Sequence, residues 1–423
     1  MTLHLSEQDR AFLDGKHGRA GRFAMSILVR MAEAQGATAM LDITGAHIDS
    51  TVYQGEATLE FAEHLAELGG QVTVPSSVNV SGVDPEGWRE WAVPEDWAMK
   101  AYRQMQAYQS MGCTPTWTCA PYQTAMRPRF GQQIAWGESN AIAFANSVIG
   151  ARTERYPDLM DICAAITGRV PALGLHLDEN RRGELLMRLV DVPIEIQRDD
   201  TFCTVLGFLM GQIAQERIPV IEGVEILPTE DDLKMMGAGG ASAGAVALFH
   251  IVGVTPEAST TATAFGGREP EETFDIDLAT LQRARRELTT NDRDTVDMVA
   301  LGSPHFSLAE FERLAPLLKG RRKHDNVEFL VTTSRMMRAL AEQAGLLEPL
   351  REFGARITVD TCILTTPMLP ESITQIMTNS AKYAYYSPGL LNARVAFGGI
   401  ADCVETAVNG KVSRDERVWG AGA

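Results

Sequence analysis

Three cysteines are the residues of this chain best suited to chemistry. Cys119, Cys362 and Cys403 lie far apart in the sequence, and each adjoins polar or turn-forming residues rather than an apolar run. Three thiolates brought together by the fold would hold an iron–sulfur cluster and leave one iron open. An open iron is a Lewis acid that could act on a bound substrate. A single metal ion, iron or zinc, is the alternative that these residues leave open.

The remaining cysteines differ in their surroundings. Cys163 and Cys203 lie within apolar segments, so we expect both to pack in the core. Cys113 is close to Cys119 in the sequence and is an alternative ligand. Because the sequence has no Cys-x-x-Cys pair, a closed structural zinc site is disfavoured.

A polar segment, residues 45–55, follows the first predicted strand and contains imidazole, carboxylate and hydroxyl groups. His47 beside Asp49 could take part in acid–base chemistry or position a polar substrate. The alternative is a loop histidine that is satisfied by local hydrogen bonds.

Two further groups of residues could bind an anion. Glu138 and Ser139 precede a predicted helix over residues 141–148, where they could bind a substrate carboxylate or position a proton. They could equally serve only as helix caps. Lys382 is flanked by tyrosines and serines and could bind a carboxylate or phosphate. Its alternative is a surface lysine whose stem packs on apolar neighbours.

The framework that must position these groups alternates strands and helices. This alternation favours an α/β fold of parallel sheets, in which ligands bind beyond the carboxyl ends of the strands. Cys362 directly follows one predicted strand, and Cys403 is expected in the first turn of a helix. The glycine-rich segment 237–244 lacks the Lys-Ser/Thr ending of a nucleotide loop, which favours close helix packing. Strands are expected at residues 38–43, 71–75, 296–301, 327–332 and 356–359, and helices at 21–35, 59–68, 308–318 and 336–344.

Length and composition suit a multidomain enzyme. A chain of 423 residues with 45% hydrophobic content can bury more than one core. We predict β-α-β domains around a shared cleft: an N-terminal domain at 1–125, a middle domain at 126–285, and a C-terminal domain at 286–423 that carries two of the three cysteines. The polar segment 259–275 is expected to be a surface connection.

Charge and hydropathy exclude several classes of partner. The net charge of −17 argues against binding of nucleic acid, and no apolar run is long enough to span a membrane. Six scattered cysteines do not form a disulfide framework, and no signal peptide is visible, so a cytoplasmic location is expected.

Several motifs together resemble the large subunit of the aconitase X family, a divergent branch of the aconitase superfamily. The resemblance extends over nearly the whole chain, and it implies an aconitase-like fold. The motifs are Gly-Ala-His-Ile-Asp-Ser, Val-Pro-Ser-Ser-Val-Asn, Gly-Cys-Thr-Pro-Thr-Trp-Thr-Cys-Ala-Pro-Tyr, Trp-Gly-Glu-Ser-Asn-Ala, Asp-Thr-Cys and Asn-Ser-Ala-Lys-Tyr-Ala-Tyr-Tyr.

The resemblance implies roles for individual residues. It assigns Cys119, Cys362 and Cys403 to an iron–sulfur cluster of two or four irons, or to mononuclear iron. It implies catalytic roles for His47, Asp49 and Glu138. It implies substrate binding by the remaining candidates, which are Ser50, Asn79, Ser139 and Lys382.

The resemblance also implies an activity and a partner. Family members dehydrate small hydroxy acids: cis-3-hydroxy-L-proline in the bacterial branch, which the His-Ile-Asp form of the first loop favours, and phosphomevalonate in the archaeal branch. A separate small subunit with a swivelling domain is expected to supply the base. An RNA-binding role for a form without its cluster is the alternative from another class.

Overall fold

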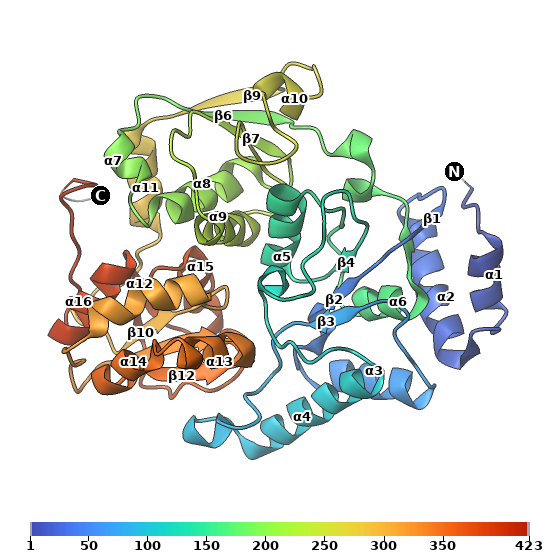
Figure 1. Ribbon diagram of the computed structural model, residues 1–423, viewed down its shortest axis with the longest axis horizontal. Helices are drawn as coiled ribbons and strands as arrows, with labels where there is room; N and C mark the ends of the chain where they lie inside the picture. Colours follow the sequence, from blue (N-terminus) through green and yellow to red (C-terminus); the bar gives the residue numbers. More distant parts are fainter. Residues whose placement is uncertain (1, 421–423) are drawn as a thin grey trace.

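The computed structural model describes residues 2–420, which form a mixed α/β structure with several parallel sheets (Figure 1). The α/β prediction is therefore confirmed. Across the described residues, no helix combines the length and the apolar character that crossing a bilayer requires.

The first third of the chain holds a small parallel sheet in the order β3-β2-β4. In this sheet β2 pairs with β3 and with β4, and Ala46 lies opposite Ser76. A separate antiparallel pair joins β1 to β5. The elements are α1 (Glu7–Leu13), α2 (Gly18–Ala34), β1 (Met40–Asp42), β2 (Ala46–Ile48), η1 (Asp49–Thr51), α3 (Glu56–Glu67), β3 (Ser76–Val78), η2 (Trp88–Glu90), α4 (Glu95–Ser110), η3 (Pro121–Gln123), β4 (Ala135–Trp136), α5 (Ser139–Phe144), the π-helical turn η4 (Ala145–Ile149), α6 (Met160–Thr167), β5 (Arg169–Pro171), η5 (Gly174–His176) and η6 (Asp178–Asn180).

One strand prediction in this region was only partly right, and another was wrong. The strand expected at 38–43 is shorter, and it pairs antiparallel with β5 outside the parallel sheet. The strand expected at 71–75 is absent, and β3 begins at Ser76 instead. Pro75 has no amide hydrogen and only accepts a bond, 2.9 Å from the amide of Ala46. Because proline cannot donate to a ladder, strand pairing begins after it.

The middle third forms a four-stranded parallel sheet in the order β8-β7-β6-β9. The prediction of a surface connection at 259–275 was partly wrong, because this segment contains α10 and most of β9, which pairs with β6. The elements are β6 (Leu185–Leu189), α7 (Ile194–Gln197), α8 (Phe202–Ala214), β7 (Pro219–Glu222), α9 (Glu230–Ala243), β8 (His250–Ile251), α10 (Thr261–Ala264), β9 (Glu272–Ile276) and α11 (Leu278–Glu287).

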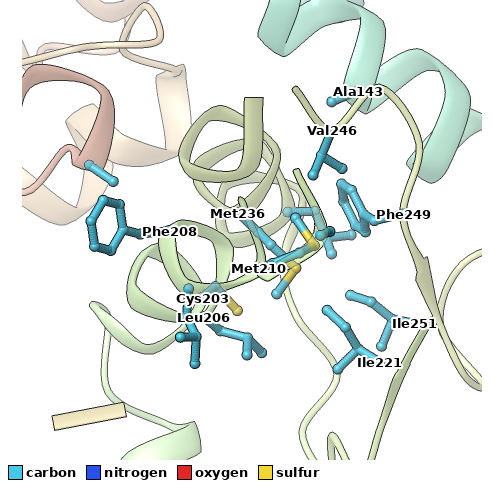
Figure 2. Close-up of a cluster of buried hydrophobic side chains, with 14 of the residues drawn as sticks. Ala143, Cys203, Leu206, Phe208, Met210, Ile221, Met236, Val246, Phe249 and Ile251 are labelled. Atoms are coloured by element: carbon cyan, nitrogen blue, oxygen red, sulfur yellow. The ribbon is translucent and has the colours of Figure 1, made fainter. Parts of the chain in front are cut away.

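Glycines let α8 and α9 pack backbone against backbone. A Cβ added at Gly207 would lie 2.3 Å from the carbonyl oxygen of Met236, and one at Gly239 would lie 2.8 Å from the amide nitrogen of Phe208. Figure 2 shows Cys203 and Phe208 among the apolar side chains around this helix pair. The prediction of close helix packing for the glycine-rich segment is thus confirmed.

The last third is a five-stranded parallel sheet in the order β12-β11-β10-β13-β14, and its elements follow the prediction closely. A capping box at Ser307 begins α12, as a capping box at Ser6 begins α1 in the first third of the chain. The elements are β10 (Met298–Leu301), α12 (Leu308–Leu318), β11 (Glu328–Thr333), α13 (Arg335–Gln343), α14 (Leu347–Phe353), β12 (Arg356–Val359), β13 (Gln375–Thr378), α15 (Ala381–Leu390), β14 (Arg394–Phe397) and α16 (Ile400–Asn409).

Candidate active site

A cavity of about 260 Å³ lies where the strand ends of the first and last sheets meet. Its wall is built from the segments that follow β2, β3, β4, β10 and β12, and from one side of α15. Ligands of α/β proteins bind beyond the carboxyl ends of parallel strands, and this cavity occupies that position between two sheets. The lining residues are Asp49, Val52, Gln54, Asn79, Val80, Cys119, Gly137, Glu138, Ser139, Ser303, Cys362, Leu364, Thr365, Lys382, Tyr386 and Leu390.

Two of the three predicted cysteines face this cavity together. Cys119 and Cys362 share a small apolar patch with Val52 and Val80. The Sγ of Cys119 accepts a hydrogen bond of 3.2 Å from the amide of His305. Burial raises the pKa of the Cys119 thiol to about 12, and burial also raises the pKa of Cys362. Both thiols are therefore neutral unless a bound cation stabilises the thiolate.

His305 joins the two cysteine-bearing segments, and it was not among the residues that we predicted for the site. The Nδ1 atom of its ring lies 3.2 Å from the hydroxyl oxygen of Thr118, and the Nε2 atom lies 3.0 Å from the carbonyl oxygen of Thr361. Burial lowers the pKa of His305 to about 4, so the ring is neutral and donates from Nε2. The one available signal was its position after the strand β10.

Cys403 does not join the other two cysteines. It lies in α16 and is fully buried in the apolar core of the last sheet, beside Val299 and Val404. The polar neighbours that suggested a site belong to the outer face of the helix, whereas Cys403 points inward. Its assignment as a third ligand at this cavity is therefore corrected. Ser303, which sequence reasoning missed, lines the cavity instead.

The donor set at the cavity does not fit a cluster held by three cysteines. Within residues 2–420, no group of three or more histidine, cysteine, aspartate or glutamate side chains is arranged to hold a metal ion. The cavity offers two thiols, from Cys119 and Cys362, beside oxygen atoms such as the Ser303 hydroxyl. Soft thiolate ligands with oxygen neighbours suit a single iron or zinc ion.

Asp49 and Asn79 form a hydrogen-bonded pair at the cavity wall. Asn79 Nδ2 donates to Asp49 Oδ1, and both residues line the cavity. Burial raises the pKa of Asp49 well above its ordinary value, and the carboxylates of Glu138, Asp158 and Asp161 raise it further. Asp49 therefore favours its protonated form, which can donate a proton or a hydrogen bond.

Glu138 and Lys382 form an ion pair across the cavity. The Nζ of Lys382 lies 2.6 Å from Glu138 Oε1. The second oxygen, Oε2, caps α5 by accepting from the amide of Ala141 at 2.8 Å, and it also accepts from Asn140. Burial alone would lower the pKa of Lys382, but Glu138 and the neighbouring thiols raise it, so the lysine stays charged. Ser139 lines the same wall at the first residue of α5.

The other two predicted residues lie behind the cavity wall. His47 is fully buried within β2, where its Nδ1 lies 2.8 Å from the hydroxyl of Ser77. Burial lowers the pKa of His47 to about 3, so it is neutral. Ser50 is also buried, and its hydroxyl contacts Asp161 and the amide of Leu159 rather than the cavity.

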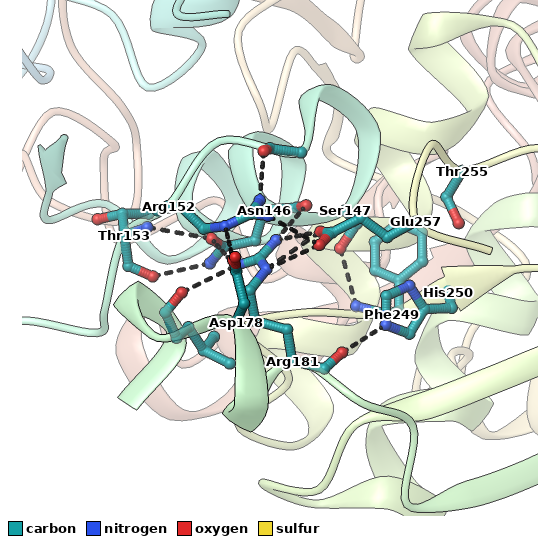
Figure 3. A network of polar contacts seen from close by, with 12 residues as sticks. Asn146, Ser147, Arg152, Thr153, Asp178, Arg181, Phe249, His250, Thr255 and Glu257 are labelled. Carbon is teal, nitrogen blue, oxygen red and sulfur yellow. Dashed lines mark hydrogen bonds and ion pairs between the residues drawn. The ribbon is translucent and has the colours of Figure 1, made fainter. Parts of the chain in front are cut away.

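The far end of α5 is anchored by a buried polar network (Figure 3). Helix α5 continues into the π-helical turn Ala145–Ile149, whose Asn146 accepts from Arg181 through both its side-chain and its main-chain oxygen at 3.0 Å. Arg181 also pairs with Glu257, and its carbonyl oxygen lies 2.8 Å from His250 Nε2. This network ties the helix that begins at Glu138 to the middle sheet.

The fold and this cavity define a protein of the aconitase type. More narrowly, the chain belongs to the aconitase X family. It matches the family models for the first domain over residues 2–179, the second domain over residues 184–286 and the third domain over residues 296–409.

Known relatives cover nearly the whole chain. It is 47% identical to a cis-3-hydroxy-L-proline dehydratase of Hypocrea jecorina, with 97% of this chain and 69% of that protein covered. It is also 47% identical to a Pseudomonas aeruginosa protein of the same name, with 97% and 71% covered. The phosphomevalonate dehydratase large subunit of Methanocaldococcus jannaschii is 32% identical, with 95% and 100% covered.

The structure agrees with these relationships. Aconitase X of Thermococcus kodakaraensis, solved in its holo-form, superposes with a TM-score of 0.85 at 30% identity, covering 96% of this chain and 100% of that one. The chain is accordingly a dehydratase, a hydro-lyase of the aconitase superfamily.

Proposed function

We propose that this chain removes water from cis-3-hydroxy-L-proline. The observation that carries the proposal is the charge of the cavity: among the described residues that line it, Lys382 is the single cation, facing Asp49 and Glu138. A volume of about 260 Å³ suits a small ring, and one lysine suits one carboxylate. The relatives of this name, at 47% identity, support the same substrate.

The chemistry requires loss of the proton on the carbon beside the carboxylate and loss of the hydroxyl on the next carbon. The two electrons of the broken C–H bond form the C=C bond, and the hydroxyl leaves as water after it takes up a proton. The enamine product then tautomerises to 1-pyrroline-2-carboxylate. Asp49 is suited to supply the proton to the leaving hydroxyl, because burial and the nearby carboxylates raise its pKa and so favour its acid form.

Lys382 and Glu138 are suited to position the substrate. The ammonium of Lys382 can neutralise the substrate carboxylate, while Glu138 holds the lysine in place and can accept from the ring nitrogen. Ser139 and Asn79 supply further polar contacts on the same wall.

A metal ion is the proposed cofactor, and Cys119 and Cys362 are the residues that would hold it. Family likeness suggests an iron–sulfur cluster, but two of the three expected thiols, and not the third, lie at the cavity, so a single iron ion is the form that we propose. When bound, such an ion would act as a Lewis acid on the leaving hydroxyl.

We further propose that a small subunit completes the site. The chain aligns with the full length of a phosphomevalonate dehydratase large subunit, and it aligns with 69% to 71% of the two longer hydroxyproline dehydratases. Among the described residues that line the cavity, we assign none as the base for the substrate C–H, because the pKa of Asp49 is raised, which favours its acid form, and Glu138 is paired with Lys382. A base on a partner subunit is consistent with both points.

Phosphomevalonate is the second candidate substrate, because the archaeal large subunits share 32% to 36% identity with the chain. It carries a phosphate in addition to a carboxylate, and a phosphate is usually bound by several cations or by helix amides. A single lysine already paired with Glu138 makes this substrate the weaker fit.

The test is a substrate comparison with the iron-loaded chain, alone and mixed with a candidate small subunit. Product formation is followed by nuclear magnetic resonance and mass spectrometry. We expect conversion of cis-3-hydroxy-L-proline with loss of one water, and none of 5-phosphomevalonate. Conversion of phosphomevalonate alone would overturn the substrate assignment, and full activity of the isolated chain would overturn the shared site.

A further inference from the structure

The buried carboxylate of Asp161 lies outside the cavity but makes several hydrogen bonds to the turn that carries Asp49. Asp161 lies at the start of α6 and is fully buried. Its Oδ2 accepts from the amides of Asp49 at 2.6 Å and Ser50 at 3.0 Å. Its Oδ1 accepts from the Ser50 hydroxyl and from the amide of Ile162 at 2.7 Å. Both oxygens are therefore used, and most of their donors belong to the turn that carries Asp49.

The turn at 49–51 is also held by the hydroxyl of Thr51, which donates to the carbonyl oxygens of Ile48 at 3.1 Å and Asn79 at 3.3 Å, but Asp161 is the side chain that accepts from its first two amides. This segment follows β2 as the single 3-10 turn η1, which has no side-chain cap. The amides of Asp49 and Ser50 would lose these acceptors without Asp161, because a short turn cannot bond its first amides internally. On its other side, the carbonyl oxygen of Ser50 accepts from Gln104 at 2.9 Å and from Tyr108 at 3.1 Å.

The surrounding backbone is shaped to bring Asp161 close. Leu159, just before α6, has a positive φ of 74°, which places its amide 2.8 Å from the Ser50 hydroxyl. Gly137 follows β4 on the opposite side, and a Cβ there would lie 2.7 Å from the Asp49 Cβ and 2.9 Å from Asp161 Oδ2. Such close approach requires a glycine, and a left-handed leucine persists only where its surroundings impose it.

We propose that Asp161 is a positioning residue: it holds the 49–51 turn so that the carboxyl group of Asp49 faces Asn79 and the cavity. Asp161 itself does not line the cavity, so it acts through Asp49. Because a displacement of about 1 Å at a reacting group can cost about 100-fold in rate, the geometry of this turn matters for turnover.

The kinetic part of this inference rests on the proposed dehydration, so the experiment includes a readout that does not. Amide hydrogen exchange at residues 49 and 50 reports the turn directly, whatever the substrate is. All variants are studied as the iron-loaded chain with its small subunit, and each is checked by its unfolding temperature.

Asp161→Leu replaces the carboxyl group with an apolar branched group and removes every acceptor. We expect amide exchange at 49 and 50 to become at least about 10-fold faster and kcat to fall about 100-fold, with KM changed less than about 3-fold. Asp161→Asn retains an acceptor oxygen and a group that can contact the Ser50 hydroxyl, so it should restore kcat to within about 10-fold of the parent. Ser50→Ala keeps the hydrogen bonds from the amides of residues 49 and 50 to Asp161, so its exchange rate and its kcat should lie between those of Asp161→Leu and Asp161→Asn.

Asp158→Asn is the matched control. Asp158 lies near Asp49 and raises its pKa, but its carboxylate bonds the side chain of Gln54 and not the turn backbone. It should leave amide protection unchanged. An amide exchange rate and a kcat in Asp161→Leu equal to those of the parent would overturn the proposal. If Asp161→Leu does not fold, the proposal is overturned when Ser50→Ala exchanges at the parental rate and Asp158→Asn loses amide protection. If the parent enzyme does not convert the imino acid while exchange responds as expected, the function fails and the positioning role stands.

Discussion

The ammonium of Lys382 lies 2.6 Å from a carboxylate oxygen of Glu138, a residue 244 positions earlier in the chain. One partner begins α5 beside the first sheet, and the other lies in the first turn of α15 beside the last sheet. The pair therefore spans the cavity and links the two walls that form it.

Lys382→Met should remove the charge that we assign to substrate carboxylate binding. It would also leave Glu138 without its counter-ion in a buried place. We expect kcat/KM to fall by about 100-fold or more, since removing one charged group that contacts the reacting molecule commonly costs that much. Lys411→Met is the control, because Lys411 is exposed and, among residues 2–420, its ion pair is a single one with Asp294 at 3.5 Å. Turnover within about 3-fold of the parent in Lys382→Met would contradict the assignment.

Asp49→Asn should test whether the protonated carboxyl group donates a proton. The pKa of Asp49 is raised, so its acid form persists above pH 3.8 and is lost as the pH rises through the folded-state value. The parent enzyme should therefore lose activity on the alkaline side through this group. Asp49→Asn cannot supply the proton, and its kcat should fall by about 100- to 10,000-fold. Glu60→Gln, on the exposed side of α3, should change neither kcat nor its dependence on pH. Steady-state kinetics from pH 5 to 9 decide the matter, and an unchanged kcat in Asp49→Asn would refute the acid role.

The two cavity thiols and the core thiol should behave differently towards iron. Cys119→Ala and Cys362→Ala should each lose bound iron and its visible absorption, because each removes one of two thiolates at the site. Cys403→Ala should retain the iron and lose about 1 kcal/mol of stability from its core position. Metal analysis and absorption spectra measure the first effect, and denaturant unfolding the second. Loss of iron in a folded Cys403→Ala protein would restore Cys403 as a ligand.

Buried histidines should make the fold sensitive to acid. Burial, together with the positive charge of Arg181, lowers the pKa of His176 to about 3. A lowered pKa contributes stability that is fully present above the ordinary value of 6.5 and is lost as the pH falls towards the folded value, by about 1.4 kcal/mol for each pH unit per histidine. His176→Gln should therefore show a shallower decline of the unfolding free energy between pH 6.5 and 5 than the parent. His64→Gln, at an exposed position, should decline as the parent does. Equal slopes for all three proteins would show that His176 is not buried in its neutral form.

The packing of α8 against α9 can be tested with one methyl group. Gly207→Ala would place a Cβ 2.3 Å from a backbone oxygen, and we expect a loss of about 1–3 kcal/mol from the forced separation of the helices. Gly389→Ala in α15 is the matched control, because nothing lies within 4 Å of its added Cβ. It should stabilise the protein by about 0.5–1 kcal/mol, as alanine does at an open helical glycine. Chemical denaturation would reveal both signs, and a neutral Gly207→Ala would contradict the tight packing.

The last sheet could be predicted well from the sequence, and the first could not. Strand β10 is a continuous apolar run, Met-Val-Ala-Leu, and β11 has Phe-Leu-Val at its centre, which is the usual pattern of a buried parallel sheet bounded by helices. Strands β2, β3 and β4 have only two or three residues each. Such short segments carry no periodicity, and their pairing is decided by contacts between distant parts of the chain.

The candidate site was predictable where a residue follows a strand and not where its role depends on distant contacts. Asp49 and Cys362 were found because each comes directly after a strand or a predicted strand. Cys403 was misplaced because the sequence does not show which face of α16 turns inward. His305 and Asp161 were missed because their partners lie 187 and 111 residues away, which local patterns do not reveal.

The two cavity thiols can also serve to measure the distance between two domains. Cys119 belongs to the part of the chain that matches the first domain and Cys362 to the part that matches the third, and both face the same cavity. The distance between their sulfur atoms therefore reports how close the first domain lies to the third. Bifunctional thiol reagents of graded span would measure that distance in solution, with the four cysteines that do not line the cavity, Cys113, Cys163, Cys203 and Cys403, as the background.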